Sequence, residues 1–203
     1  MRLGLIVACL SYCVGIASAD DKTDFLLRAL NDARGEEAVR VTEALIRRAA
    51  LDRPGFIGRE NNLNANLYSQ DPNLAASTSD LLSSIRTEEA LSLVLKAWAP
   101  VMGARGNQTA RYSAWAPEPL YYWFLRSISQ FGSERSAKFL VAVAVERRNS
   151  AQIRGAALQQ LVYSRYDRKR SLYDSSVIAA AKELMSSSDK KASSAAIQFL
   201  GDS

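Results

Sequence analysis

Apolar residues recur at helical spacing along almost the whole of this 203-residue chain, and no stretch alternates as a half-buried strand does. In segment 24–33, for example, Leu26, Leu27 and Leu30 fall on one helix face. The pattern predicts an all-α fold of about eight or nine antiparallel helices, stacked as pairs or as a bundle. Caps included, the expected helices cover residues 24–33, 36–51, 73–85, 87–99, 119–131, 133–147, 150–163, 174–185 and 189–200.

Residues with specific roles at helix ends mark the boundaries. Thr87 precedes two glutamates and is a predicted N-cap, and Pro100 is expected to end the helix that Thr87 starts. Pro119 suits the first turn of a helix that ends near Phe131, with Gly132 in a left-handed cap. The last four helices are expected to follow the N-caps Ser133, Ser150, Asp174 and Asp189.

The loops divide the chain into two parts of one domain that begins at residue 20. Part 20–132 contains two irregular stretches, 52–72 and 101–117, the first with a short helix expected around Leu63. Part 133–203 has short loops, which make consecutive helices antiparallel neighbours.

The first nineteen residues have the pattern of a secretory signal peptide. Arg2 is the basic start, residues 3–16 are apolar, and Ala17-Ser18-Ala19 is a cleavage pattern. The protein is therefore expected in the periplasm or outside the cell, starting at Asp20. The apolar run is short for a membrane span. The alternatives are an uncleaved anchor and a lipid attached at Cys9.

Cleavage would remove both cysteines, and the chain contains no histidine. That composition excludes Ser-His-Asp and Cys-His catalytic sites, zinc sites made of His and Cys, and disulfides within the chain. No cofactor or metal ion is predicted. Losing Arg2 lowers the number of Lys and Arg from 26 to 25 against 21 Asp and Glu, a net charge of +4. This excess is mild and does not predict a nucleic-acid partner.

The last four expected helices are similar to one another. A shift of 39 residues places Leu158 on Ile197 and Phe139 on Ile178, and helix pairs of about this length are the unit of stacked arrays. Residues 154–161 and 193–202 resemble the inner helix of HEAT-type or armadillo-like repeats. The resemblance covers about the last 70 residues. It implies an α-solenoid-like stack, a surface for protein partners, and burial of both Leu158 and Ile197.

Aromatic residues concentrate in one region. Trp123 and Phe124, with Leu120 and Ile128, form the expected core face of one helix. The neighbouring aromatic and arginine side chains are the type that dominates binding energy at protein interfaces. The predicted binding residues are Arg111, Tyr112, Trp115, Tyr121 and Tyr122.

These features predict an exported, non-enzymatic protein of the cell envelope that binds another macromolecule, in the manner of an inhibitor or immunity protein. One alternative is a carboxylate-dependent hydrolase of cell-wall polysaccharide, for which Glu60 and Glu118 are the candidate catalytic residues. Another is a structural accessory of an envelope complex. A hydrolase needs two carboxylates facing one cleft, whereas a binding protein needs an accessible aromatic patch.

Overall fold

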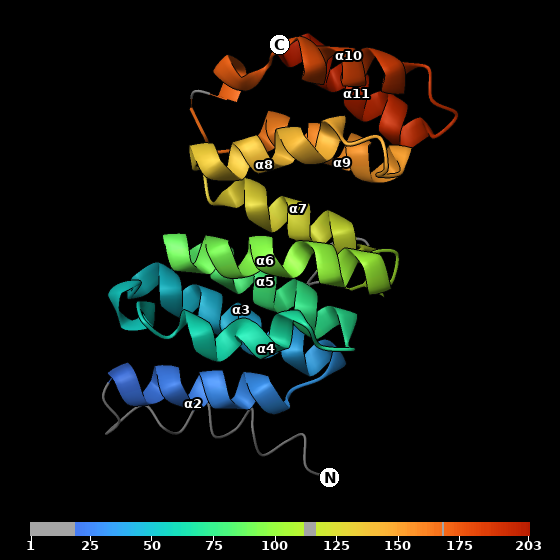
Figure 1. Ribbon diagram of the computed structural model, residues 1–203. Helices are drawn as coiled ribbons and strands as arrows, with labels where there is room; N and C mark the ends of the chain where they lie inside the picture. Colours follow the sequence, from blue (N-terminus) through green and yellow to red (C-terminus); the bar gives the residue numbers. More distant parts are fainter. Residues whose placement is uncertain (1–18, 112–116, 168) are drawn as a thin grey trace.

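The computed structural model describes residues 19–111, 117–167 and 169–203 and confirms the all-α class (Figure 1). The predicted signal peptide, Met1–Ala19, lies outside the described residues except for its last one. The helices are α2 (Ala19–Asp32), α3 (Gly35–Leu51), α4 (Asn64–Leu67), α5 (Pro72–Ile85), α6 (Glu88–Arg105), α7 (Leu120–Gln130), α8 (Glu134–Val145), α9 (Ala151–Tyr163), α10 (Ser175–Met185) and α11 (Lys190–Asp202). Short 3-10 turns are η1 (Pro54–Phe56), η2 (Glu60–Leu63) and η3 (Lys169–Leu172), and β1 (Thr109–Ala110) pairs antiparallel with β2 (Glu118–Pro119).

The helices form a stack of pairs. The odd-numbered helices α3, α5, α7, α9 and α11 pack one on the next in chain order. Each even-numbered helix from α2 to α10 packs on the odd-numbered helix that follows it. Figure 1 shows this order, with α2 at one end and α10 and α11 at the other. The arrangement is α-solenoid-like, as expected from the sequence; the type of repeat stays a prediction.

Helices α9 and α11 run side by side in the same direction. Gln152 bonds Asp189 near their first turns, and the Gln198 amide donates to the Tyr163 hydroxyl (3.0 Å) near their ends. Between these contacts, a Cβ on Gly155 would lie 2.6 Å from the Cα of Ala192. Glycine is therefore required for this close approach of the two backbones.

The core runs through the stack and includes the expected face of α7. Leu120, Phe124 and Ile128 have no exposed surface, and Trp123 is 3% exposed. Buried hydroxyls also connect the odd-numbered helices, which form one row in the stack. The oxygens of Ser79 on α5 and Ser127 on α7 are 2.9 Å apart, and Ser129 donates to Gln160 on α9 (3.2 Å). Because these polar groups have partners, burying them is tolerated.

Two sequence predictions are wrong. Pro100 lies inside α6 and does not end it. It is exposed, as is Lys96, whose carbonyl loses its usual donor to the proline, and Val101 and Arg105 beyond it are buried. Ile197 is 57% exposed, whereas Leu158 is fully buried. Helix α9 is packed between α7 and α11, whereas α11 contacts α9 and α10 and no further described helix follows it in the row.

The predicted caps are confirmed. The side chains of Thr87, Ser133, Ser150, Asp174 and Asp189 each accept a hydrogen bond from a main-chain N–H in the first turn of the helix that follows. Gly132 has a φ of +65°, the left-handed conformation that glycine adopts without a steric penalty.

Candidate binding groove between α7, α9 and α11

A groove of about 680 Å³ opens where the starts of α7 and α11 meet α9. Its volume lies within the usual range of ligand pockets, about 300–1,000 Å³. The lining combines two tyrosine rings and small apolar residues with amide, carboxylate and ammonium groups. It comprises Asn107, Glu118, Pro119, Tyr121, Tyr122, Gln152, Ala156, Gln159, Asp189, Lys190, Lys191, Ser194 and Ala195.

Main-chain hydrogen bonds hold the α7 side of the groove in place. The N–H of Leu120 donates to the carbonyl of Gln108 (2.8 Å), and the N–H of Tyr121 donates to that of Gly106 (3.1 Å). These bonds satisfy the first donors of α7, whose preceding residue Pro119 makes no side-chain cap. The two tyrosines consequently start a helix whose position is fixed.

The structure brings two of the predicted binding residues, Tyr121 and Tyr122, into the groove. Tyr121 is 8% exposed, and its side chain makes no hydrogen bond to another described residue. Burial raises the pKa of its phenol above the usual value, and the charges of Glu118 and Asp189 add to that effect. Tyr122 is half-buried and meets the ring of Trp123 edge to face, with 5.7 Å between centroids.

The other predicted binding residues are not part of this lining. Arg111 is exposed, and its main-chain N–H donates to the side-chain oxygen of Asn73 on α5 (2.7 Å). Tyr112 and Trp115 lie outside the described residues. The site predicted from the aromatic cluster is therefore described only at its helical end.

Both carboxylates of the groove already have partners. The Lys191 ammonium donates to both oxygens of Glu118, at 3.1 and 3.2 Å. Asp189 accepts from the main-chain N–H of Ala192 (2.9 Å), and this bond, with one from Gln152, lowers the pKa of its carboxyl. Lys190 is exposed and forms no ion pair with another described residue.

Glu60, the other candidate carboxylate, lies in a different part of the fold. It is 2% exposed in η2 and accepts a hydrogen bond from the Thr87 hydroxyl (2.8 Å). The same hydroxyl accepts from the N–H of Ala90 and caps α6. Glu60 thus supports a helix start, and it does not line the groove that contains Glu118.

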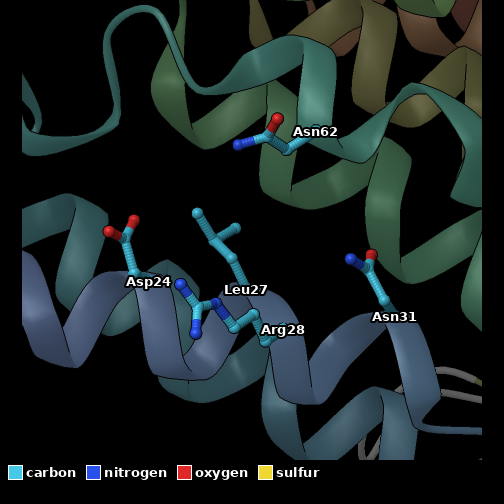
Figure 2. Close-up of a pocket in the computed structure, with 5 residues that line it drawn as sticks. All are labelled: Asp24, Leu27, Arg28, Asn31 and Asn62. Atoms are coloured by element: carbon cyan, nitrogen blue, oxygen red, sulfur yellow. The ribbon is translucent and has the colours of Figure 1, made fainter.

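A second, smaller pocket of about 310 Å³ lies between α2 and η2 (Figure 2). Asp24, Leu27, Arg28 and Asn31 of α2 face Asn62 of η2 across it. Asp24 pairs with Arg59 (3.0 Å), and the Asn31 side chain accepts from Asn66 (2.9 Å). These bonds fasten α2 to the chain above it, which is a structural role.

The contributions of α9 and α11 to the groove were not predicted from the sequence. Gln152, Ala156 and Gln159 are spaced four and three apart, so they share one side of α9. Lys190 and Lys191 occupy the first turn of α11, where the helix dipole disfavours cations. Both signals are readable, but neither shows which helices meet.

The described residues contain no group of three or more Asp, Glu, His or Cys side chains that could hold a metal ion. In the same part of the chain, every helix is too short or too polar to cross a bilayer. Comparisons with protein-family models, curated proteins and solved structures found no match.

Proposed function

We propose that this protein is exported and acts without catalysis, binding a protein partner of the cell envelope through the groove between α7, α9 and α11. An inhibitor or immunity protein works in this way. The observation that carries the proposal is that Tyr121 and Tyr122 line the same groove as ammonium and amide groups. Tyrosine supplies a large contact area at low entropic cost and is enriched at interface hot spots.

The charge state of the groove favours binding over hydrolysis. A glycosidase needs one carboxyl that holds a proton and one that is free to act as a base or nucleophile. In the groove, Glu118 is held by Lys191, and the pKa of Asp189 is lowered by its cap. A carboxyl with a lowered pKa is a poor proton donor near neutral pH.

The stack of helix pairs supports the proposal as well. Consecutive packing of α7, α9 and α11 gives a rigid surface built from segments far apart in the sequence. A pre-organised surface lowers the entropic cost of binding. The signal-peptide pattern of Met1–Ala19 supports export.

The test is retention of a partner from an envelope extract by the immobilised protein and by two variants. Tyr122→Ala is expected to weaken binding by about 2 kcal/mol or more, the threshold of a hot spot. Tyr68→Ala is the matched control, because Tyr68 is 38% exposed and lies in the N-terminal part. Circular dichroism of both variants verifies that the fold is kept.

The proposal would be contradicted if both variants lost retention to the same extent, or if neither variant lost it. A wall-degrading activity that Glu118→Gln abolishes without unfolding the protein would favour the hydrolase instead. The proposal also assumes export with cleavage of the signal peptide. Intact-mass analysis of the exported protein tests this assumption, which predicts loss of Met1–Ala19.

A further inference from the structure

The two most exposed large hydrophobic side chains of the described residues lie in one short segment, where α3 ends. Leu51, the last residue of α3, is 83% exposed, and Ile57, which follows η1, is 61% exposed. Single exposed hydrophobic residues are common on protein surfaces and need no explanation. Two of them within one turn of the chain form a local apolar surface that water solvates poorly.

Short-range hydrogen bonds fix the conformation of this turn. The main-chain N–H of Gly55 donates to the carboxylate of Asp52 (3.2 Å), and the guanidinium of Arg59 donates to the carbonyl of Gly55. Phe56 has no exposed surface and anchors the turn in the core. Because Phe56 occupies the core position, the adjacent Ile57 stays at the surface. The exposure of the apolar side chains is therefore a property of a well-anchored turn.

The same segment concentrates positive charge. Residues 47–59 contain four arginines and one aspartate, a net charge of +3, whereas the entire chain carries +5. Two of the arginines are held by the carboxylates of Asp52 and Asp24. The other two, Arg47 and Arg53, are exposed and form no ion pair with another described residue. These two cations are available to an anionic partner.

The combination of free arginines and exposed apolar side chains matches the chemistry of an anionic bilayer surface. Arg47 lies one helical turn before Leu51, so the two side chains share one face of α3. Apolar side chains gain by entering the boundary between headgroups and acyl chains, while arginines bind the lipid phosphates beside them. A polyanion such as a nucleic acid would satisfy the arginines only and would leave Leu51 and Ile57 in water.

The neighbouring helix shows the same combination. The turn η1 packs against α2, at one end of the stack (Figure 1). Helix α2 exposes Phe25 (52%), and its Arg28 forms no ion pair with another described residue. The groove lies farther along the row of odd-numbered helices, because α5 and α7 separate α3 from α9. A bilayer at the turn and a protein in the groove can therefore be bound at the same time.

We propose that the basic apolar turn, residues 47–59, binds the protein peripherally to bilayers that contain anionic lipid. Leu51 and Ile57 enter the headgroup boundary, and Arg47 and Arg53 contact the lipid phosphates. The charges of the turn and of the bilayer are complementary, and the apolar side chains select a bilayer over a soluble polyanion. This inference goes beyond the proposed function and does not depend on the groove.

The test is flotation of the purified protein with two kinds of vesicle. One is phosphatidylcholine alone, and the other is phosphatidylcholine mixed with phosphatidylglycerol. Binding to the mixed vesicles is expected to be at least about tenfold tighter and to weaken as salt is raised. Equal binding to both kinds of vesicle, or no binding to the mixed vesicles, would overturn the inference.

A pair of charge variants locates the contact. Arg47→Gln combined with Arg53→Gln is expected to weaken binding to the mixed vesicles at least about tenfold. Arg148→Gln combined with Lys182→Gln is the matched control, because it removes the same charge from exposed positions in residues 133–203. A loss of the same size in the control would show attraction to net charge only and would refute a specific surface.

A pair of apolar variants distinguishes a bilayer from a soluble polyanion. Leu51→Ser combined with Ile57→Ser keeps the charge and is expected to weaken vesicle binding at least about fivefold. Ile197→Ser, at another exposed position, is the control. If the Leu51 and Ile57 variant binds the mixed vesicles as the unchanged protein does, or if duplex DNA binds as tightly as those vesicles, the inference is wrong. Circular dichroism verifies that each variant is folded.

The groove variant separates this inference from the proposed function. Tyr122→Ala is expected to bind the mixed vesicles as the unchanged protein does, and the variants of the turn are expected to keep the envelope partner. Loss of vesicle binding in Tyr122→Ala would place the lipid contact at the groove and would refute the assignment to the turn.

Discussion

The two parts of the stack differ in how many of their helices start at a local side-chain cap, because in the described part of residues 20–132 only α5 and α6 have one, from Asp71 and Thr87. In residues 133–203, each of the four helices is capped by the residue before it: Ser133, Ser150, Asp174 and Asp189. In residues 20–132, α3 and α7 have no side-chain cap of their own. Asp71 supplies the acceptor for Gly35, 36 residues away (2.5 Å), and the carbonyls of Gly106 and Gln108 do so for α7.

The difference shows which helix ends are set by neighbouring residues and which depend on tertiary contacts. A local cap forms as soon as its helix forms, because the bond spans two or three residues. A cap that spans 36 residues exists only after α3 and α5 have packed together. We therefore expect the N-terminal part to depend more on tertiary structure for its helix ends, although both parts share one core.

The largest expected effect tests that the core is common to both parts. Leu81 on α5 and Leu158 on α9 are fully buried, so truncation of either to alanine is expected to lower the free energy of unfolding by about 2–5 kcal/mol. Ile197→Ala, at an exposed position, is the control and should change it by about 0.5 kcal/mol or less. Urea unfolding measures all three. If only one of the two leucine variants lowered the free energy of unfolding by this much, the core would not be shared equally by the two parts.

An intermediate effect tests the caps. Asp71 accepts from Gly35 with one oxygen and from Asn73 with the other, so Asp71→Ala removes caps of two helices and should cost about 2 kcal/mol. Asp174→Ala removes one local cap and should cost about 1 kcal/mol. Asp71→Ser keeps a cap for α5, so its cost in free energy of unfolding is expected to lie between those of the two alanine variants. Equal costs for the two alanine variants would refute the contrast.

The smallest expected effect is on the dependence of stability on pH. The pKa values of Asp174 and Asp189 are lowered by hydrogen bonds from neighbouring residues, and that of Glu183 is lowered by Arg154. All three carboxyls belong to part 133–203. A lowered pKa in the folded state gives stability that is complete above the unfolded value, near 4, and is lost as pH falls further.

The melting temperature should accordingly fall below about pH 4.5, with less fall when Asp174 and Asp189 are both changed to Asn. Asparagine still caps a helix, so the double variant removes the charges and keeps the caps. Melting followed by circular dichroism at pH 6 and pH 3 measures the difference. An identical fall in both proteins would place the acid-sensitive groups elsewhere.

The sequence by itself determined the helices and most of their ends. Thr87, Ser133 and Asp189 cap as predicted, because capping acts over two or three residues that are visible together in the chain. The face of α7 that carries Trp123 and Phe124 was also predictable, since helical spacing alone brings apolar residues onto one side.

Tertiary structure decided the rest. Pro100 continues a helix because buried residues follow it, and Ile197 is exposed because no described helix packs on its side of α11. The groove depends on contacts between residues 37 positions apart, such as Gly155 and Ala192, that no local pattern encodes. Lys190 and Tyr121 are brought to one groove by the packing of α7, α9 and α11, because they lie on helices far apart in the sequence.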